Sequence, residues 1–304
     1  ESAVAAGFMV SDKLRVGDSA GSAGIFVTAA VEEREELMAV NATFAWGLKG
    51  GTQEKWKKNR CLVVQNVKGG LAWHRRNSGA ALSEDPLEAV TRAYIAAIDS
   101  FEENIPALTW PAEDQKFLHA LVPDNYTNYF EHFRQICGIA GDDSSLIEAY
   151  GKFLNRAVAG TTSSMMVPVM DFQNHGRGPA KNIGNKLTHQ HKPDPSPYVM
   201  FAVRPLKAGE ELCGCYGSTT KHLLEHDGFL ERYPRVWKCG FDHDKSTNKL
   251  DFDFVVDENL TVHWIQPDSG CEYPWVFLRM PPQGSLKRCV ERLAQLEGAA
   301  KAFP

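Results

Sequence analysis

The chain has 304 residues, of which 43% are hydrophobic and 23% are charged, as in ordinary globular proteins. This length can bury either one large core or two modest ones. The formal net charge of −5 argues against a surface built for bulk nucleic-acid binding. No apolar run approaches the roughly 18 residues that a membrane-spanning helix needs, so we expect no transmembrane segment.

Short strands are expected in the first part of the chain. Residues 14–16 precede a glycine-rich turn at 17–24, and a second strand opens at 25–27. A third strand is predicted at 37–40, after a turn rich in glutamate. A further strand, CLVVQNV, is predicted at 61–67. The basic residues just before it fit an anionic partner or a solvated helix face, and the acidic balance of the chain favours the helix face.

From residue 83 onward the pattern becomes helical. Ser83 can cap a helix that has Pro86 in its first turn, and apolar residues follow at helical spacing. Further helices are predicted at 111–121, 125–137 and 144–158. We interpret the aromatic residues of this block as packing between helices rather than as a platform for stacking bases; they are Phe117, Tyr126, Tyr129, Phe130 and Phe133.

The stretch from residue 165 to residue 229 combines strands with conspicuous polar motifs. An apolar run leads into the polar elbow DFQNH at 171–175. Strands are predicted at 198–203 and 212–216. The sequence YGST at 216–219 then opens a short helix. Beyond residue 234 the alternating pattern predicts a hairpin within 236–267, followed by an amphipathic terminal helix at 285–303.

The seven cysteines are odd in number and widely spaced. We therefore expect buried, reduced thiols in a reducing compartment rather than a disulfide scaffold. Cys213 and Cys215 fall in a predicted strand, so both side chains are expected on one face. The expected location is cytoplasmic or organellar. The first residue is Glu1 rather than Met, which fits removal of a mitochondrial or plastid transit peptide as well as a trimmed chain.

Several short motifs follow one another between residues 152 and 229. They are Asn155-Arg156-Ala157, Val167-Pro168, Asp171, Asn174-His175, Lys207-Ala208-Gly209-Glu210-Glu211, Tyr216-Gly217 and Asp227-Gly228-Phe229. In this order they resemble the SET-domain protein methyltransferases. More narrowly, they are similar to the subgroup that includes the Rubisco large-subunit lysine methyltransferase and the actin-histidine methyltransferase. The order of the motifs is more specific than any one of them, since Asn-His alone would indicate nothing.

The resemblance implies an α+β fold, in which a SET-domain β-fold of short strands with a pseudoknot is interrupted by an inserted helical segment. It implies an N-terminal part of the SET domain at 1–82, the helical insertion at 83–160 and a C-terminal part at 161–235. A reduced or diverged extension follows at 236–304, where the subgroup normally continues into a larger helical substrate-binding domain.

The activity implied by the resemblance is methylation of a non-histone protein, with S-adenosyl-L-methionine as the donor. Lysine is the main expected acceptor, and histidine is an alternative because the subgroup includes both. Methyl transfer is an in-line displacement, so the acceptor amine must be neutral and aligned in a dry channel. The resemblance gives Tyr216 the catalytic role of fixing the acceptor. The alternative for Tyr216 is simple packing at a strand-to-helix junction.

The resemblance also implies five donor-binding residues. Gly24 and Phe26 would line the donor pocket through their main chain, because glycine lets the backbone approach without a Cβ in the way. The family's Gly-x-Gly pattern is Ser22-Ala23-Gly24 here, so the first glycine is replaced. A glycine-rich turn is otherwise an ordinary hairpin feature.

The remaining three donor-binding residues are Arg156, Asn174 and His175. Arg156 would pair its guanidinium with the carboxylate of the donor, for which the planar fork is suited. Asn174 and His175 would bind the donor through their backbone and through the Asn amide. The alternatives are a surface ion pair for Arg156 and an Asx turn with a hydrogen-bonded histidine at 174–175.

Two other classes of function remain open at this stage. His222-Leu-Leu-Glu225-His226 fits a zinc-peptidase pattern that needs a further ligand, but these residues already occupy the helix that follows the family's tyrosine, so no metal site is expected. A SET fold that no longer catalyses, acting as a structural or interaction subunit of a larger complex, fits the altered glycine motif and the short extension. The retained Arg156, Asn174, His175 and Tyr216 favour an enzyme. In either case the expected partners are proteins and not nucleic acid.

Overall fold

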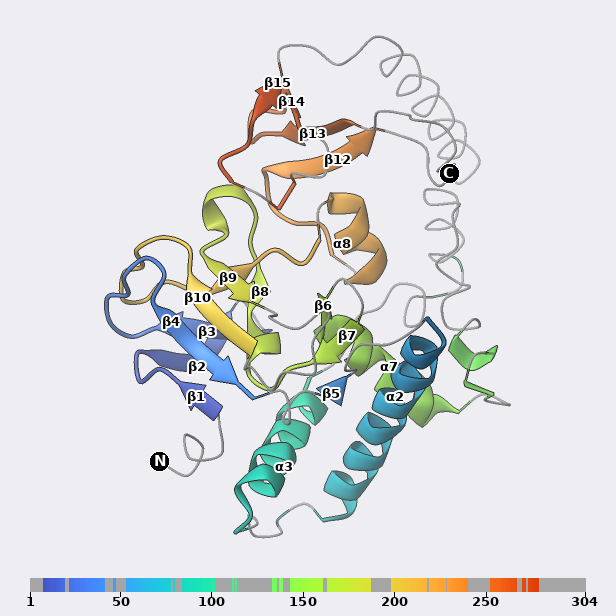
Figure 1. Cartoon of the computed structure of the whole chain (residues 1–304). Coiled ribbons are helices and arrows are strands. Elements are labelled where there is room, and N and C mark those ends of the chain that lie inside the picture. The colour runs from blue at the N-terminus through green and yellow to red at the C-terminus, as the bar shows by residue number, and fades with distance from the viewer. Residues whose placement is uncertain are drawn as a thin grey trace. The chain divides into compact units, whose positions relative to one another are not determined.

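The structure, a computed structural model, is shown in Figure 1. It describes residues 8–19, 22–41, 46–47, 53–77, 79, 84–101, 111, 113, 133–135, 137–138, 143–160, 163–186, 198–217, 219–227, 229–239, 252–266, 270–271 and 273–278. The chain divides into two compact units. The first unit comprises Glu1–Glu103, Phe130–His175 and Asn182–Gly214, and the second comprises Asn104–Tyr129, Gly176–Lys181 and Cys215–Pro304.

The described strands of the first unit form small, separate sheets. The largest is antiparallel, in the order β1 (Phe8–Val10), β4 (Glu36–Val40), β10 (Tyr198–Ala202) and β9 (Ile183–Lys186). β2 (Leu14–Ser19) and β3 (Ser22–Val27) form a hairpin. An antiparallel sheet has the order β5 (Trp46–Gly47), β7 (Ser163–Met166) and β6 (Ala157–Gly160). β8 (Asn174–His175) and β11 (Cys213–Gly214) form a parallel pair.

The inner strands form because their apolar residues can be buried on both faces. β4 and β10 pair with Met38 opposite Met200, and both methionine side chains are buried. Such runs of apolar residues are typical of strands that are covered on both sides. The strands predicted at 25–27, 37–40 and 198–203 are therefore confirmed. The predicted glycine-rich turn is shorter than expected, because Gly17 and Gly24 pair with each other in the β2–β3 ladder.

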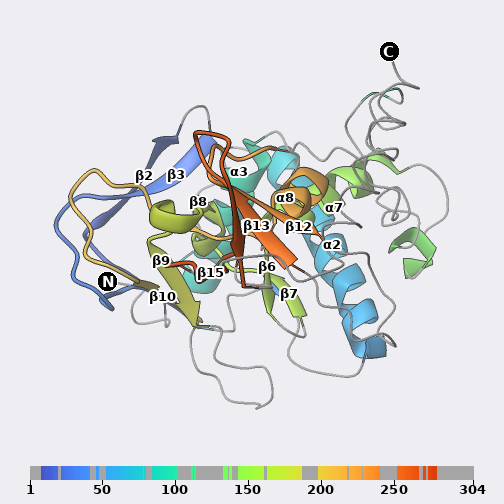
Figure 2. The same ribbon diagram turned by 90° about the horizontal axis from the view of Figure 1, so that it is seen from above.

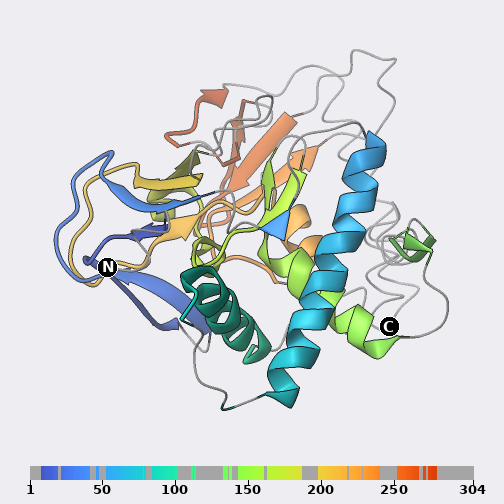
Figure 3. The ribbon, with the colours of Figure 1, turned by 60° about the horizontal axis from the view of Figure 1, so that its bottom comes forward.

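The first unit also contains α-helices. α2 (Gln53–Arg76) packs against both α3 (Pro86–Asp99) and α7 (Ser144–Arg156). Figure 3 shows α3 (teal) alongside α2 (light blue) and α7 (green) crossing it. The helices predicted from Pro86 and Ser144 are confirmed, and α7 ends at Arg156, where β6 begins. The side chain of Asp143 caps α7 by accepting a hydrogen bond from the backbone N–H of Leu146.

The strand predicted at 61–67 was wrong, because these residues belong to α2. Val64, Val67 and Leu71 are buried, whereas Leu62 is 49% exposed. That spacing of three and four residues is helical, and an alternating strand would have buried every second residue. The β-branched residues suggested a strand, but burial of one helical face against α3 and α7 decides the local structure.

The expectation of reduced cysteines was also wrong. Cys61 is joined to Cys137 and Cys215 to Cys271, with Cα–Cα distances of 5.6 Å in both pairs. The partners are 76 and 56 residues apart in the chain, so only the folded backbone brings them within bonding range. β11 ends at Gly214, so Cys213 and Cys215 do not share a strand face. With four of the seven cysteines in disulfides, cysteine spacing no longer indicates a reducing compartment.

The second unit contains an antiparallel sheet in the order β12 (Arg235–Cys239), β13 (Phe252–Val256), β14 (Val262–Ile265) and β15 (Phe277–Leu278). Its buried core is made by Val236, Val255 and Ile265, against which Trp275 packs. Figure 2 shows this sheet with α8 (Thr220–His226), which packs against β12. The predicted C-terminal hairpin is confirmed as β13 and β14, and β12 and β15 extend it on either side.

Two short 3-10 helices complete the described elements, at Met170–Phe172 in the first unit and Gly178–Ala180 in the second. The Ser83 cap, most of the helices predicted at 111–121 and 125–137, and the terminal helix at 285–303 lie outside the described residues. Within the described part of the chain, no helix combines the length and the apolar character needed to cross a membrane.

Candidate functional site

The first unit gathers three distant segments of the chain around β3. β3 pairs with β2 and also with residues 209–212. The backbone N–H of Val27 donates to the carbonyl of Glu210 at 2.8 Å, and that of Leu212 donates to the carbonyl of Ile25 at 2.7 Å. The motif that precedes Tyr216 in the sequence is therefore built into the same sheet as the glycine motif.

The Glu211 carboxylate is the centre of this junction. Its Oε1 accepts a hydrogen bond from Asn174 Nδ2 at 2.6 Å, and its Oε2 accepts one from Ser19 Oγ at 2.8 Å. Asn174 Nδ2 also donates to the carbonyl of Ala23 at 3.0 Å. The amide nitrogen of Asn174 thus uses both of its N–H groups within the protein, where it ties residue 174 to β3 and to Glu211.

Gly24 is buried at the point where these groups meet. A Cβ at this position would lie 3.0 Å from Ser19 Cβ and 3.2 Å from Asn174 Nδ2, and it would also collide with the Glu211 carboxylate. A larger residue would force the Glu211 carboxylate to move and would crowd Ser19 and Asn174, so glycine suits this position. Phe26 follows on the same strand, and the guanidinium of Arg15 lies 4.8 Å from the centre of its ring.

Asn182 is a structural residue of the junction that the sequence did not reveal. Its buried side chain donates from Nδ2 to the carbonyl of Glu211 at 2.7 Å and accepts at Oδ1 from the backbone N–H of Cys213 at 2.8 Å. Its own backbone N–H donates to the carbonyl of Cys213 at 3.0 Å. Asn182 therefore clamps residues 211–213 from one side. No sequence signal separates it from the other asparagines nearby, because its partners lie about thirty positions away.

The Asn-His motif forms β8 and runs parallel to β11, with Asn174 opposite Cys213 and His175 opposite Gly214. A Cβ on Gly214 would lie 2.9 Å from Oε1 of the buried Gln173, so the two strands approach closely here. Burial, together with the charge of Glu211, raises the pKa of the Cys213 thiol to about 12. This thiol is protonated at neutral pH and is not a nucleophile.

Arg156 lies at the end of α7, beside the aromatic rings that precede β8. Its guanidinium carbon is 4.8 Å from the ring centre of Phe101 and 5.3 Å from that of Phe172. Phe172 in turn packs near Tyr94, with ring centres 6.3 Å apart. The Tyr94 hydroxyl donates to the buried carboxylate of Asp171. These contacts fix the elbow at 171–175 between α3 and the end of α7.

Tyr216 belongs to the second unit, where both of its neighbours are anchored. Cys215 is bonded to Cys271, and the carbonyl of Gly217 accepts a hydrogen bond from Arg177 Nη2 at 3.0 Å. Arg177 is buried and donates from Nε to Oε2 of Glu231 at 2.8 Å. This buried pair and the disulfide determine where the backbone of Tyr216 lies within its unit.

The structure thus brings Gly24, Phe26, Asn174 and His175 together in one unit, with Arg156 beside the same elbow. Tyr216 is placed in the other unit. His222 lies on α8 of that unit, whereas the side chains of Glu225 and His226 lie outside the described residues. Among the described residues, no group of three or more His, Cys, Asp or Glu side chains could hold a metal ion.

No protein-family model matches this sequence, and the search of curated proteins gave no match either. Solved structures do match. A structure of Rubisco LSMT bound to AdoMet superimposes with a TM-score of 0.50 at 11% identity, over 86% of this chain and 65% of that one. The fold is that of a SET domain. A crystal structure of the SET domain of LSMT bound to lysine and AdoHcy gives a TM-score of 0.46 at 12% identity, over 86% of this chain and 66% of that one.

The chain therefore spans slightly less than two thirds of these SET-domain structures. The α+β class, with short antiparallel sheets and a set of helices, is confirmed. The domain boundaries at residues 82, 160 and 235 remain a prediction, as do the roles of the individual site residues.

Replacing Asn182 by alanine should destabilise the junction. It leaves a partly buried carbonyl and a partly buried N–H without their partner, which costs about 1–3 kcal/mol of unfolding free energy. The control is Asn185→Ala, which removes a longer contact of 3.4 Å to Gln173. Urea unfolding of both variants measures the difference. Equal losses in the two variants would contradict the clamp.

Because of the buried carboxyl of Asp227, in the second unit, we expect the unfolding free energy of the protein to depend on pH. Burial raises the pKa of its carboxyl from 3.8 to about 7. The folded state therefore holds a proton that the unfolded state releases, so this group's contribution is complete below pH 3.8 and is lost as the pH rises through 7. Asp227→Asn removes the penalty and should raise the unfolding free energy at pH 8 by an amount on the order of 4 kcal/mol.

Urea unfolding between pH 4 and pH 8 tests this prediction, with Asp257→Asn as a control of opposite sign. His263 and backbone N–H groups lower the pKa of Asp257, so removing that carboxylate should not stabilise the protein. An Asp227→Asn variant no more stable than wild type at pH 8 would be the contrary result.

Proposed function

We propose that the protein is an S-adenosyl-L-methionine-dependent protein N-methyltransferase that acts on lysine of a non-histone protein, with histidine as the alternative acceptor. The observation that supports it most is the junction at Glu211. There the glycine motif, the Asn-His motif and the segment that leads to Tyr216 meet through direct hydrogen bonds. The resemblance assigns donor binding to these segments.

The residues of the junction fit a bound donor of this kind. Gly24 packs closely against Ser19, Asn174 and Glu211, which keeps the main chain of β3 next to residues 174–175, where the proposal places the donor. Because the amide nitrogen of Asn174 is already used on Ala23 and Glu211, its contact with the donor runs through the backbone of residues 174–175. The proposal therefore differs from the sequence-based expectation, in which the Asn174 amide also binds the donor.

Arg156 binds the carboxylate of the donor in this proposal. Its guanidinium is held near the rings of Phe101 and Phe172, which restricts its position before any ligand arrives. A planar fork held in place loses less conformational entropy when it binds a carboxylate than a mobile side chain does.

Tyr216 orients the acceptor. The donor, when bound, supplies an activated methyl group on a sulfonium sulfur. The hydroxyl of Tyr216 aligns the neutral amine for attack, and the proton that the amine loses leaves to solvent. The anchored backbone on both sides of Tyr216 supports this role, because a group that positions a reacting atom must itself be held.

A second candidate is a SET-fold subunit that does not catalyse and instead holds protein partners. The hydrogen bonds at the Glu211 junction also support this candidate. The Asn174 amide nitrogen and the Glu211 carboxylate already satisfy one another and their neighbours, so the cluster is complete without a donor. Serine in place of the first motif glycine points the same way.

Transfer of tritiated methyl groups to a mixture of cellular proteins distinguishes the two candidates. The wild-type protein should label protein, and acid hydrolysis should release the label as methyl-lysine or methyl-histidine. Tyr216→Phe removes the orienting hydroxyl and should lower the rate about 100-fold.

Tyr273→Phe is the matched control, because it removes an exposed hydroxyl from the same unit and should leave the rate unchanged. If both variants label as fast as wild type, Tyr216 does not have the proposed role. If the folded wild-type protein transfers no label at all, the non-catalytic candidate is favoured.

A further inference from the structure

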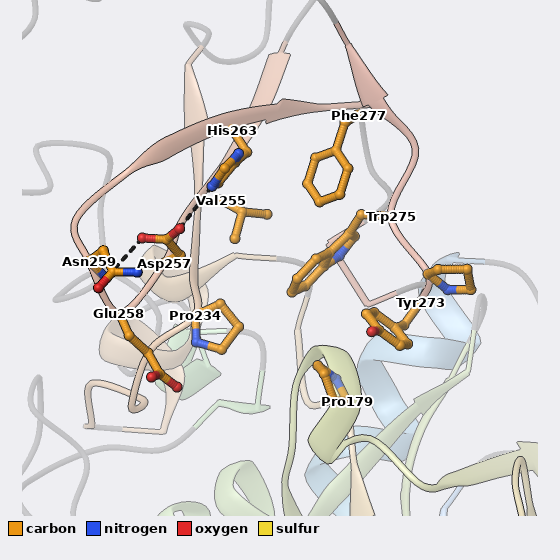
Figure 4. A pocket seen from close by; sticks show the side chains of 11 residues that line it. Pro179, Pro234, Val255, Asp257, Glu258, Asn259, His263, Tyr273, Trp275 and Phe277 are labelled. Atoms are coloured by element: carbon orange, nitrogen blue, oxygen red, sulfur yellow. Dashed lines mark hydrogen bonds and ion pairs between the residues drawn. The ribbon is translucent and has the colours of Figure 1, made fainter.

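The second unit carries a pocket of about 370 Å³ at one face of its sheet. Figure 4 shows the side chains that line it. The rings of Tyr273, Trp275 and Phe277 line it together with Pro179 and Pro234. The volume falls near the lower end of the roughly 300–1,000 Å³ range of pockets that bind small ligands.

Two of the aromatic rings that line the pocket are perpendicular to each other. Tyr273 and Trp275 have ring centres 5.5 Å apart with an interplanar angle of 90°. Trp275 is held against the backbone at Gly178, where a Cβ would lie 2.7 Å from its Cη2 atom. Gly178 has a φ of +58°, so glycine suits this position on two counts. The indole is therefore a fixed wall, with the other two rings beside it.

Two of these rings are unusually open to solvent. Tyr273 is 54% exposed and Phe277 is 58% exposed, and their neighbour Val276 is 59% exposed. β15 ends the sheet order among the described strands, so these residues lie where an extended peptide could run past. Adjacent exposed aromatic and aliphatic side chains of this kind mark a binding surface more often than isolated ones do.

The polar side of the pocket is negatively charged. Oδ1 of Asp257 accepts hydrogen bonds from the backbone N–H groups of Asn259 and Thr261, each at 2.9 Å. Oδ2 of Asp257 lies 2.9 Å from His263 Nε2. The His263 contact and these backbone donors hold the pKa of Asp257 below its ordinary value, so the carboxyl is ionised at neutral pH. Glu258 adds a second, exposed carboxylate.

This combination selects a cation. Ring faces attract positive charge, and the carboxylates strengthen the field at the pocket. A bare ammonium would give up hydrogen bonds to water on entering, and the Asp257 oxygens are already engaged by three donors. A methylated ammonium has few or no N–H groups to satisfy and offers apolar surface to the rings.

We propose that this pocket binds the trimethylated lysine side chain of a partner protein. The aliphatic stem of the lysine passes the exposed Tyr273 and Phe277, and the trimethylammonium group sits against Trp275. This inference does not depend on the proposed methyl transfer, because every residue that it uses lies in the second unit, outside the junction at Glu211.

Calorimetric titration with three blocked peptides tests the proposal. They share the sequence acetyl-Ala-X-Ala-amide, in which X is trimethyllysine, unmodified lysine or the neutral tert-butyl analogue of trimethyllysine. The trimethyllysine peptide should bind at least about 10-fold more tightly than either of the others, because it alone combines charge with apolar surface.

Substitutions test whether the trimethyllysine peptide binds at this pocket. Tyr273→Leu keeps an apolar side chain but removes a ring face, and it should weaken binding of the trimethyllysine peptide about 10-fold. Tyr273→Phe keeps the ring and should bind as wild type does. Leu260→Ala changes another exposed apolar residue, 66% exposed at the start of the segment leading into β14, and should have no effect.

Several results would overturn the proposal. They are no binding of the trimethyllysine peptide at millimolar concentration, equal binding of the neutral analogue, tighter binding of unmodified lysine, or an undiminished affinity in Tyr273→Leu. Circular dichroism of each variant confirms that it is folded. None of these results bears on methyl transfer, so failure of one proposal is distinguishable from failure of the other.

Discussion

The hydrogen bond between the Asn174 amide and the Glu211 carboxylate holds the first unit's functional segments in place. Asn174 and Glu211 are 37 residues apart, and the Ala23 carbonyl that completes the contact is 151 residues from Asn174. Three remote parts of the chain therefore meet at one charge-assisted contact of 2.6 Å, beside the backbone bonds that join β3 to residues 209–212. Close packing extends to Gly24, since a Cβ there would collide with the Glu211 carboxylate and crowd Asn174 Nδ2.

In the second unit, a buried ion pair and a disulfide hold the chain around Tyr216. Arg177 and Glu231 form a buried ion pair whose remaining groups bond to the carbonyls of Gly217 and Gly270 and to the hydroxyl of Thr220. Removing one partner of such a pair leaves an uncompensated buried charge, so both residues are tied to the local fold. The Cys215–Cys271 disulfide fixes the same stretch covalently. Tyr216 lies within this doubly fixed segment.

The sequence predicted the elements whose pattern is local. The strands at 25–27, 37–40 and 198–203, the helices that begin near Pro86 and Ser144, and the C-terminal hairpin all follow from periodicity and end signals within their own residues. The motif order also indicated the α+β SET fold, which a solved structure at 11% identity supports.

The features that the sequence missed all depend on partners far along the chain. The segment at 61–67 has a strand-like composition, but helices that lie well beyond it in sequence bury one of its faces. The two disulfides join cysteines 76 and 56 residues apart. Asn182 has no distinguishing neighbours, yet its side chain bonds to two residues about thirty positions away. Long-range pairing of this kind leaves no periodic trace.

Binding of S-adenosyl-L-methionine to the purified chain, measured by calorimetry, tests the central claim most directly. Wild type should bind one equivalent, and Arg156→Ala should lose most of the affinity because it removes the partner of the donor carboxylate. Arg76→Ala changes another arginine of the first unit, exposed at the end of α2, and should bind as wild type does. Absence of binding by the folded wild-type protein, or equal binding by Arg156→Ala, would contradict a donor site at this junction.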